Sequence, residues 1–371
     1  MRKLIFNATI LNDKQTGLGI YTKNILFRLL ESGIIDTIIC DVNDYTTNNI
    51  IGKVNCKVVP LELSRGRLSA LKRNYKFNNF INNNYNKNDI LVYSPTQHLV
   101  MNNNLNQIVT IHDLMPLLYP KGRAHQYFYY KVLIPKYIRK VNKVITVSEN
   151  TKKDIVKFYD VDKEKVKVIY NGYDMNDKFT KQESRNYIFN KYNIEGYFFM
   201  VGIHYRYKNL HTVIEAYSKI YKEINLKLVI AGNSKVEYGR ELVSLVDRLG
   251  LNEHVIFLGY VNDDEKEMLY KASNALIYPS LYEGFGLPVL EAMYNETPVL
   301  CSNTSSLPEV VSTAAILFNP LDEVDIINAM RTIISNKEVS TKYINAGLEN
   351  IKKFSWDKTA EEVKQIIIEL L

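Results

Sequence analysis

The chain has 371 residues, enough for two domains at about 150 residues each. Hydrophobic residues make up 46% of it and charged residues 23%, which allows two buried cores and excludes a disordered or fibrous chain. The net charge of +7 is unevenly divided: residues 1–180 hold 27 Lys and Arg against 15 Asp and Glu (+12), and residues 181–371 hold 20 against 25 (−5). A basic first half is typical of a surface that faces phosphate, nucleic acid or a membrane.

The cysteines and the first residues indicate the compartment. Cys40, Cys56 and Cys301 are odd in number and have no CxxC spacing, which favours a reducing cytosol over a disulfide framework or a zinc site. Asn7 interrupts the apolar run near the start, so we interpret residues 3–8 as a strand rather than a signal peptide. No apolar run reaches the roughly 18 residues of a membrane span. We expect a cytoplasmic protein, peripheral on the inner face of the membrane where it meets one.

Short apolar runs alternate with longer amphipathic ones, the pattern of parallel sheets covered by helices. In chain order, the first half predicts strands at 3–8, 37–40, 57–59, 90–93, 108–112, 144–147 and 166–170, and helices at 20–31, 68–81, 126–140 and 150–159. The second half predicts strands at 197–201, 226–231, 255–258, 275–278, 298–301 and 315–317, and helices at 210–222, 237–249, 263–272, 288–294 and 324–335, followed by two more.

The expected fold class is therefore α/β, with two Rossmann-like domains whose parallel sheets face a central cleft. The polar segment 172–183 lacks periodicity and is the expected linker, which gives domains of 1–180 and 181–355, with the helix 356–371 packing back on the first. Ligands of open parallel sheets bind beyond the carboxyl ends of the strands. We therefore expect the chemistry in the strand-to-helix turns.

The first such turn holds Gly17 and Gly19, directly before a helical pattern. Glycines at a loop-to-helix junction let the backbone approach a phosphate, although an ordinary glycine turn has the same sequence. A dinucleotide fingerprint is incomplete here, because Lys23 and Asn24 stand where its last glycine would fall.

Two further turns carry titratable side chains. His112 and Asp113 follow the fifth strand, where a histidine could bond a substrate hydroxyl or developing charge; a structural His-Asp pair is the alternative. Arg206 and Lys208 stand directly before a helix in the acidic half. A bidentate Arg fork and a Lys point charge suit a pyrophosphate, and a solvated pair of surface cations is the alternative.

The segment 279–293 is the most informative one. It runs from a strand end through a glycine-rich turn, with Pro288 in the first turn of a short helix that carries Glu291. We expect the backbone N–H groups of 285–287 to point at an anion, Glu291 to bond ribose hydroxyls, and Glu283 to meet the transferred group. A buried carboxylate without a partner would be costly, which argues against a purely structural role.

At these residues the sequence resembles the retaining glycosyltransferases of family 4, which have the GT-B fold, over nearly the whole chain. The most specific element is the pair Glu283 and Glu291 within EGFGLPVLEAM, with SSLPEV at 305–310 beside it. Supporting matches are Gly17 and Gly19, residues 110–114, 147–149, 168–174 and Lys208-Asn209. One departure is that the family places its arginine soon after the glycine at 202 or next to the lysine, whereas Arg206 stands two residues before Lys208.

The resemblance implies a nucleotide-sugar donor held by the second domain and an acceptor bound by the first. It implies ribose binding by Glu291, contact of His112 and Glu283 with the transferred sugar, and a diphosphate bound by Arg206 and Lys208. The remaining donor-binding residues that it implies are Gly17, Gly19, Gly284, Phe285, Gly286, Leu287, Tyr260 and Val261. It also implies a bacterial surface-polysaccharide hexosyltransferase, with mannose from GDP-mannose as the first expectation and a UDP-hexose as the second.

No cofactor or metal is expected, because fixed cations and helix N-termini can stabilise a departing diphosphate. Asp160 and Asp162 match the Asp-x-Asp pattern of metal-dependent transferases, but they lie in a charged stretch far from the phosphate candidates. The acceptor is expected to be a glycan or a polyprenyl-diphosphate-linked molecule. A basic surface for it or for an inner-leaflet membrane would use Lys72, Arg73, Lys76, Arg139 and Lys140; solvated charge is the alternative.

Three other functions remain open on sequence alone. Another GT-B enzyme, such as a sugar-nucleotide epimerase or a phosphorylase, would release no nucleotide in response to an acceptor. An NAD-dependent oxidoreductase lacks the full glycine fingerprint. A nucleic-acid-binding protein lacks an arginine-rich helix or a known module, so no nucleic-acid partner is expected.

Overall fold

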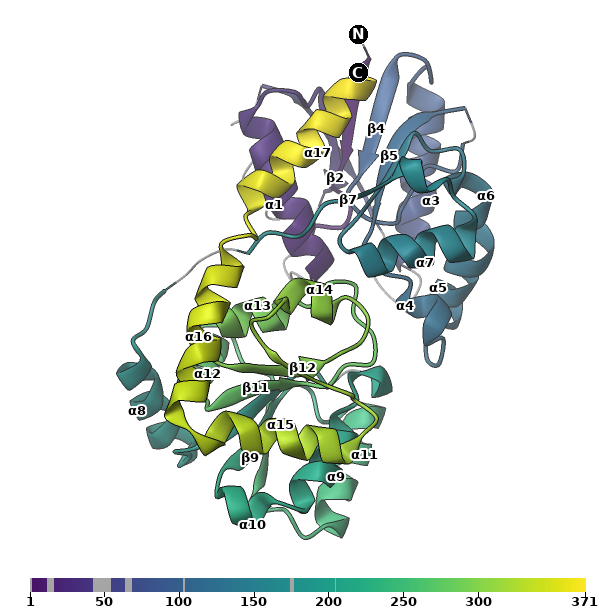
Figure 1. The fold of residues 1–371 in the computed structure, drawn as a ribbon. Helices are drawn as coiled ribbons and strands as arrows, with labels where there is room; N and C mark the ends of the chain where they lie inside the picture. Colours follow the sequence, from purple (N-terminus) through teal and green to yellow (C-terminus); the bar gives the residue numbers. More distant parts are fainter. Residues whose placement is uncertain are drawn as a thin grey trace. The chain divides into compact units, whose positions relative to one another are not determined.

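The computed structural model describes residues 2–11, 17–42, 55–63, 69–102, 104–173, 177–203 and 205–371. The chain divides into two compact units, residues 1–172 with 355–371 and residues 173–354. Each unit is an α/β domain with one parallel sheet (Figure 1), as the sequence predicts. We describe each unit by itself.

The first unit contains a seven-stranded parallel sheet in the order β3-β2-β1-β4-β5-β6-β7. Its strands are β1 (Lys3–Asn7), β2 (Thr37–Asp41), β3 (Lys57–Leu61), β4 (Ile90–Ser94), β5 (Asn106–Ile111), β6 (Lys143–Thr146) and β7 (Val166–Val168). Its helices are α1 (Gly17–Glu31), α3 (Ser69–Asn84), α4 (Met115–Leu118), α5 (Ala124–Phe128), α6 (Ile134–Ile138), α7 (Glu149–Tyr159) and α17 (Trp356–Leu370).

The single helix predicted over 126–140 is instead α5, a π-helical turn at Tyr129–Leu133, and α6. Pro135 lies in the first turn of α6. A proline cannot donate to the carbonyl four residues earlier and its ring crowds that carbonyl, which is a reason for the wider turn just before it.

The second unit contains a six-stranded parallel sheet in the order β10-β9-β8-β11-β12-β13. Its strands are β8 (Tyr197–Val201), β9 (Lys227–Ala231), β10 (Val255–Gly259), β11 (Ala275–Tyr278), β12 (Val299–Ser302) and β13 (Ile316–Phe318). Its helices are α8 (Lys181–Tyr192), α9 (Leu210–Ser218), α10 (Tyr221–Ile224), α11 (Glu237–Arg248), α12 (Asp263–Ala272), α13 (Leu287–Tyr294), α14 (Leu307–Val311), α15 (Glu323–Ser335) and α16 (Lys337–Ile351).

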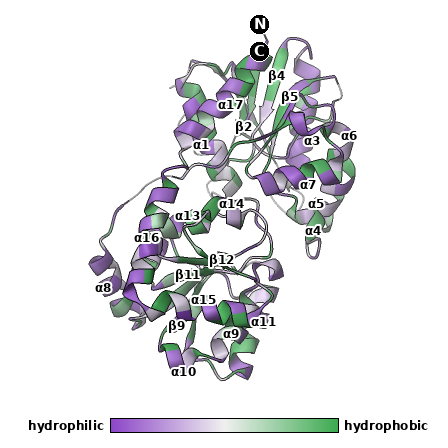
Figure 2. Cartoon of the chain, viewed as in Figure 1, coloured by the Kyte–Doolittle hydropathy of each residue, from purple (hydrophilic) through white to green (hydrophobic). Residues whose placement is uncertain are grey.

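The central strands are mostly apolar because helices cover both faces of each sheet. All four residues of β11 and of β12 are buried. Figure 2 shows the consequence, with hydrophobic residues concentrated in the sheets and hydrophilic ones on the outer faces of the helices. Among the described helices, none is both long and apolar enough to pass through a bilayer.

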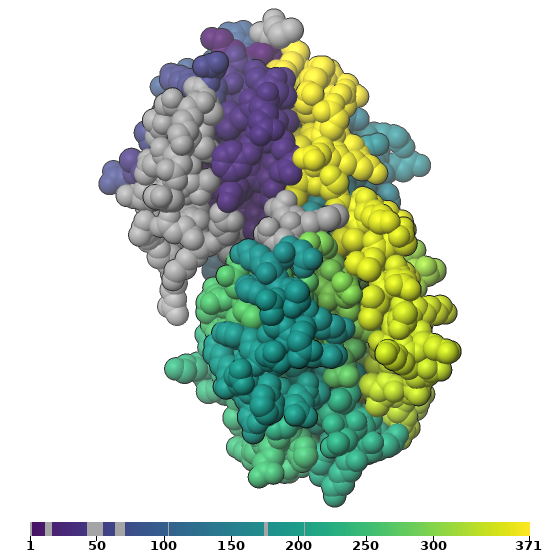
Figure 3. Space-filling model, turned by 90° about the vertical axis from the view of Figure 1, so that its left-hand side faces the viewer, coloured from purple at the N-terminus to yellow at the C-terminus, as the bar shows by residue number. Residues whose placement is uncertain are grey.

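The helix α17 belongs to the first unit, where Trp356 and Val363 join the core of β1 and α1. Figure 3 shows α17, in yellow, lying against the purple α1. A Cβ atom added to Gly172 would lie 2.2 Å from the backbone nitrogen of Trp356, so only glycine permits this approach.

The boundary between the units falls after Gly172, not between residues 180 and 181 as expected. The segment that follows is bonded into the second unit. The backbone N–H of Lys178 donates to Glu267 at 3.0 Å, and its ammonium group pairs with Asp264 at 2.6 Å. These bonds to α12 give a polar segment without periodicity a fixed place.

Candidate active site

The neighbouring strands β8 and β11 bring Lys208 and Glu283 together in the second unit. Lys208 ends a short 3₁₀ helix after β8, and Glu283 lies in the turn after β11. The Lys208 ammonium lies 2.6 Å from Glu283 Oε1 and donates to the Tyr278 hydroxyl at 2.9 Å. Tyr278 in turn donates to Glu283 Oε1 at 2.8 Å. The side chains of Lys208 and Glu283 are only 16% and 10% exposed, so this is a desolvated ion pair.

The Lys208–Glu283 ion pair can rearrange to bind an anionic ligand. Burial and then the Glu283 carboxylate raise the pKa of Tyr278 well above its usual value, so the tyrosine stays a hydrogen-bond donor. A buried ammonium group with one carboxylate partner can exchange that partner for an anionic ligand without leaving either charge bare, provided that the ligand supplies donors to the carboxylate. Hydroxyl groups on a sugar beside a phosphate would supply them.

The turn at 283–286 is fixed from the side by two serines. Ser305 Oγ donates to the Glu283 carbonyl at 2.7 Å, and Ser306 Oγ donates to the carbonyls of Glu283 and Phe285 at 3.0 and 2.9 Å. Gly286 has φ +109°, and a Cβ atom there would lie 2.7 Å from Leu307 Cδ2. The structure thus positions the predicted residues Gly284, Phe285, Gly286 and Leu287 as a rigid entry to α13.

Glu291 lies within α13, where both carboxylate oxygens have partners. Oε1 lies 2.9 Å from the Lys266 ammonium, and Oε2 accepts from the Tyr270 hydroxyl at 2.8 Å. Burial lowers the pKa of Lys266, but Glu291 and Asp263 outweigh it and the pKa is raised. Burial and Glu291 also raise the pKa of Tyr270. The carboxylate is 19% exposed, and each oxygen keeps lone pairs for a hydroxyl donor.

In the first unit, His112 follows β5 as predicted. Its Nε2 lies 2.9 Å from the Pro95 carbonyl, which only accepts, so Nε2 carries the proton. Burial lowers the pKa of His112 to about 4, so the ring is neutral at pH 7 and its Nδ1 is an acceptor. The Tyr21 ring meets it edge-on at 4.6 Å, which fixes its plane. Asp113 Oδ1 accepts from the backbone N–H of Met115, the first residue of α4, at 2.9 Å.

Comparison with known proteins identifies the family. Residues 16–177 match "Glycosyltransferase Family 4", and residues 182–350 match "Glycosyl transferases group 1". The O-antigen chain mannosyltransferase RfbU of Salmonella typhimurium is 30% identical over 92% of this chain and 94% of its own length. The chain belongs to this glycosyltransferase family.

Further relatives and solved structures agree with that assignment. The O-antigen chain mannosyltransferase B of Escherichia coli is 31% identical to this glycosyltransferase over 67% of each chain. The structure of Anabaena HepE in complex with UDP and glucose superposes with a TM-score of 0.77 at 19% identity, covering 100% of both chains. WaaG, a glycosyltransferase of lipopolysaccharide biosynthesis, gives 0.69 at 14% identity over 98% and 99%. These two likenesses show the fold, and the expected GT-B architecture is confirmed.

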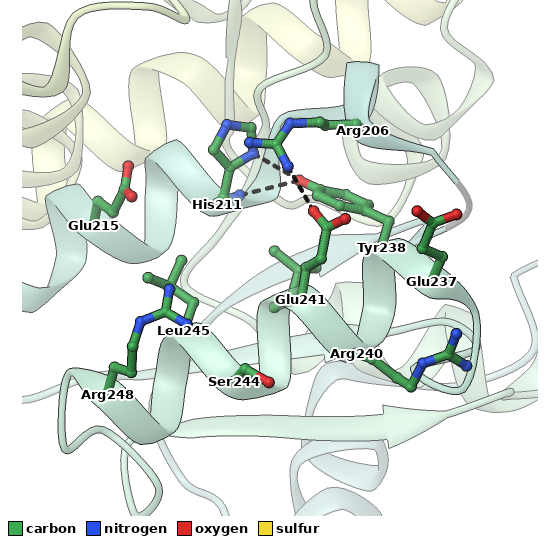
Figure 4. Close-up of a pocket in the computed structure, with 11 residues that line it drawn as sticks. Arg206, His211, Glu215, Glu237, Tyr238, Arg240, Glu241, Ser244, Leu245 and Arg248 are labelled. Atoms are coloured by element: carbon green, nitrogen blue, oxygen red, sulfur yellow. Dashed lines mark hydrogen bonds and ion pairs between the residues drawn. The ribbon is translucent and has the colours of Figure 1, made fainter. Parts of the chain in front are cut away.

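Arg206 of this glycosyltransferase pairs with a residue of α11, whereas Lys208 contacts Glu283 and Tyr278. Arg206 Nη1 pairs with Glu241 of α11 at 2.6 Å, with 67% of the arginine side chain exposed. Figure 4 shows this pair at the edge of a pocket of about 570 Å³ between α9 and α11, beside His211 and Tyr238. The pairing has a local cause: the 3₁₀ helix places residues 206 and 208 on different sides, and α11 offers a carboxylate to the first. Arg206 and Lys208 thus have different carboxylate partners, Glu241 and Glu283.

The remaining residues predicted to bind the sugar donor are Gly17, Gly19, Tyr260 and Val261. Gly17 is the first residue of α1 and is open to solvent, and Gly19 is buried in the same turn. Tyr260 follows β10 with 88% of its surface exposed, and Val261 is half-buried. Among the residues that the structure describes, no hydrogen bond or ion pair to these four indicates a role for them.

The basic residues predicted to bind an acceptor or a membrane differ in exposure and in hydrogen-bond partners. Lys72 and Lys76 are exposed on α3, where Lys76 bonds the Glu62 carbonyl, whereas Arg73 between them is half-buried. Arg139 donates to the Tyr159 carbonyl at 2.9 Å, and it and Lys140 follow α6. Burial lowers the pKa of Arg73.

Asp160 and Asp162 have structural partners. Asp160 ends α7 in the left-handed conformation with φ 52° and pairs with Arg139 at 3.4 Å. Asp162 accepts from the backbone N–H of Glu164 at 3.0 Å, at the start of a 3₁₀ turn.

Sequence reasoning missed three side chains that hold the glutamates. Tyr278 is the last residue of β11, and its position just before the turn was an available indication. Lys266 and Tyr270 lie four residues apart on α12, on the side that meets α13. That spacing marks one face of a helix, but only the fold shows that the face meets Glu291.

Proposed function

We propose that the protein is a retaining, metal-independent mannosyltransferase that moves mannose from a nucleotide-diphosphate sugar to a growing, lipid-linked glycan. The observation that carries the proposal is the desolvated Lys208–Glu283 pair beside the entry to α13. Mannose as the sugar is supported by relatives named O-antigen chain mannosyltransferases. GDP-mannose is the first candidate donor, and a UDP-hexose is the second.

The donor site supplies what the departing diphosphate needs. Roughly two negative charges develop on the leaving nucleotide, and an ammonium group in a water-poor site stabilises them far better than one in water. Lys208 is that group, and the N-terminal N–H groups of α13 add a fixed dipole. Glu291 then takes ribose hydroxyls with the lone pairs that Lys266 and Tyr270 leave open.

The sugar itself is proposed to meet Glu283 and His112. Once the diphosphate binds Lys208, Glu283 is free to accept hydrogen bonds from hydroxyl groups of the hexose. His112 is neutral, with its Nε2–H committed to Pro95, so it contacts the sugar as an acceptor through Nδ1. Neither group is proposed as a covalent nucleophile. The acceptor hydroxyl oxygen bonds the anomeric carbon on the face from which the diphosphate leaves, the bond between that carbon and the diphosphate oxygen breaks, and the hydroxyl proton passes to the leaving diphosphate. Attack on that face retains the anomeric configuration.

The acceptor proposal concerns the basic side of the first unit. Lys72 and Lys76 are exposed on α3, and Tyr75 between them is 67% exposed. Cations flanking an exposed aromatic ring suit an anionic lipid headgroup or a lipid diphosphate. Flotation with phosphatidylglycerol vesicles at low salt tests this. Charge reversal by Lys72→Glu with Lys76→Glu should abolish binding, and unchanged flotation would contradict it.

The donor assignment is tested with a panel of nucleotide sugars. A donor at 100 times its Kd should stabilise the protein by about 2.7 kcal/mol, which a thermal scan resolves. Glu291→Gln should remove most of that shift, whereas Glu349→Gln, on the surface of the same unit, should keep it. Nucleotide release that requires an acceptor distinguishes transfer from epimerisation, and the anomeric proton signals of the product report retention. A full shift in Glu291→Gln would show that the donor site is misplaced.

A further inference from the structure

Tyr21 of α1 connects the histidine of the candidate active site to the last helix of the chain. Its ring meets the His112 ring edge-on, with 4.6 Å between the centroids and 84° between the planes. It also meets the indole of Trp356, the first residue of α17, at 5.9 Å and 67°. Tyr21 and Trp356 are 1% and 3% exposed, so their contact lies inside the core of the first unit.

The hydroxyl group of Tyr21 anchors the far end of its side chain. It lies 3.2 Å from the Tyr93 hydroxyl of β4 and 3.5 Å from Thr110 Oγ1 of β5, and those two groups lie 3.1 Å apart. Burial raises the pKa of Tyr21 and of Tyr93, so both stay protonated. Three hydroxyl groups in a triangle can each donate to the next, which satisfies all three without a charge. Two strands of the sheet therefore hold the polar end of the Tyr21 ring.

The His112 ring needs a restraint of this kind. Among the described residues it has one hydrogen bond, from Nε2 to the Pro95 carbonyl at 2.9 Å. Rotation about the bond that joins the ring to Cβ is broad for histidine. Nε2 lies nearer to the axis of that rotation than Nδ1 does, so the bond to Pro95 restrains the rotation only weakly. The edge-on contact with Tyr21 limits it further, and it thereby sets where Nδ1 points.

Trp356 is itself held by its surroundings. A Cβ atom on Gly172 would lie 2.6 Å from Trp356 Cγ, so the backbone of residue 172 lies directly against the indole. One turn further along α17, Thr359 Oγ1 donates to the Tyr170 carbonyl at 2.8 Å. The start of α17 is therefore tied to the segment that follows β7, and the indole is fixed against the Tyr21 ring.

We infer that Tyr21 and Trp356 are positioning residues for His112: the start of α17 holds the indole, the indole holds the Tyr21 ring, and that ring sets the plane in which Nδ1 meets the transferred sugar. The inference rests on the proposed function, in which His112 contacts that sugar. It extends the function by giving the C-terminal helix a part in transfer as well as in the stability of the first unit. Ordinary core packing is the alternative, and the two differ in what a variant does to His112.

NMR titration of the His112 ring in the full chain tests the inference without using the reaction. Burial lowers the pKa of His112 to about 4, so about a tenth of the rings should be protonated at pH 5. Tyr21→Leu opens space beside the ring and should raise this pKa by about 1 or more, towards the ordinary value of about 6.5. Trp356→Leu should raise it in the same direction, and His112→Gln identifies the signal. A pKa that stays at about 4 in both leucine variants would overturn the inference.

Matched variants separate positioning from packing. Val363 is fully buried about two turns further along α17, so Val363→Ala should lower the melting temperature but leave the His112 pKa unchanged. Trp356→Phe keeps a ring against Tyr21 and should keep most of the wild-type behaviour. Tyr21→Phe removes only the hydroxyl anchor and remains available if a leucine variant fails to fold; it should show a smaller rise of the same pKa. A shift in Val363→Ala as large as that in Trp356→Leu would show that packing alone is responsible.

Kinetics with GDP-mannose test the consequence for transfer. Tyr21→Leu and Trp356→Leu should lower kcat about tenfold or more. The KM for the donor should stay within about twofold, because Lys208 and Glu291 lie in the second unit. In a His112→Gln background neither substitution should lower kcat further, and additive losses would refute the inference. Full activity of His112→Gln alone would instead contradict the proposed role of His112, whereas the titration still decides whether the two rings position it.

Discussion

Lys208→Met tests the physical basis of the donor site before any substrate is added. In the wild type the Lys208 ammonium lies 2.6 Å from Glu283 Oε1, and the two side chains are 16% and 10% exposed. Removing one member of a buried pair leaves the other charge without a partner, which costs about 3–5 kcal/mol. The Tyr278 hydroxyl remains as a donor to Glu283 and keeps the cost from rising further.

The double variant Lys208→Met with Glu283→Gln separates the charge effect from packing. It leaves no buried charge, and replacement of a buried pair by neutral groups is often close to neutral for stability. We expect it to recover most of the lost free energy of unfolding. A coupling of about 2 kcal/mol or more between the two positions would identify the pair as one energetic unit.

Urea unfolding followed by circular dichroism gives the free energies, and fluorescence provides an internal control. Trp356 is the single tryptophan of the chain and lies in the core of the first unit. The variants change the second unit, so the fluorescence transition should stay while the dichroism transition shifts. A cost below about 1 kcal/mol for Lys208→Met, or a double variant as unstable as the single one, would refute the desolvated-pair reasoning.

Three further predictions concern stability. Burial, and then Arg73, lower the pKa of His98 to about 3. Between about pH 6.5 and 3 the unfolded chain therefore binds a proton that the folded chain does not, so acidification from pH 6.5 to pH 5 should lower the free energy of unfolding by about 2 kcal/mol. Urea titrations at both pH values should show that His98→Gln lacks this part of the loss. Gly286→Ala should lower the free energy of unfolding by about 2–4 kcal/mol, because φ is +109° and the new Cβ would meet Leu307. Gly17→Ala, where no atom of the described residues lies within 4 Å of the new Cβ, should cost nothing. Equal melting temperatures of the two variants would contradict this. Ser306→Ala removes two bonds to the 283–285 carbonyls and should lower stability by about 1–2 kcal/mol, measured by urea unfolding, with Ser335→Ala on an exposed helix end as the control.

Much of the fold could be predicted because parallel strands covered on both faces must be apolar throughout. The run at 197–201 and the run at 275–278 were placed correctly for that reason. The broken helix at 126–140 shows the limit: its amphipathic pattern continues through Pro135, and only the backbone geometry decides that the chain widens at Tyr129–Leu133.

The residues of the site likewise divide into those that the sequence indicates and those that only the fold brings together. Glu283, Glu291 and Lys208 could be proposed from the sequence because they lie in a strand-to-helix turn or in the helix after it, in the spacing on which the family resemblance rests. Their partners were not, since Lys266 and Tyr270 are ordinary helix residues whose neighbour is set by the packing of α12 on α13. Arg206 was expected beside a diphosphate from its position before a helix and from the family resemblance, and the acidic Glu241, 35 positions later, could be brought to it only by the fold.

The return of α17 to the first unit has a consequence for synthesis on the ribosome. Residues 173–354 are continuous, so the second unit has all of its core before the chain is finished. The first unit does not, because Trp356, Ala360 and Val363 complete the cluster around β1 and α1. The apolar surface of residues 1–172 that α17 covers therefore stays exposed while the 182 residues 173–354 are synthesised. In this protein the part made first is the part that finishes folding last, and that interval is when chaperone binding or misassembly is most to be expected.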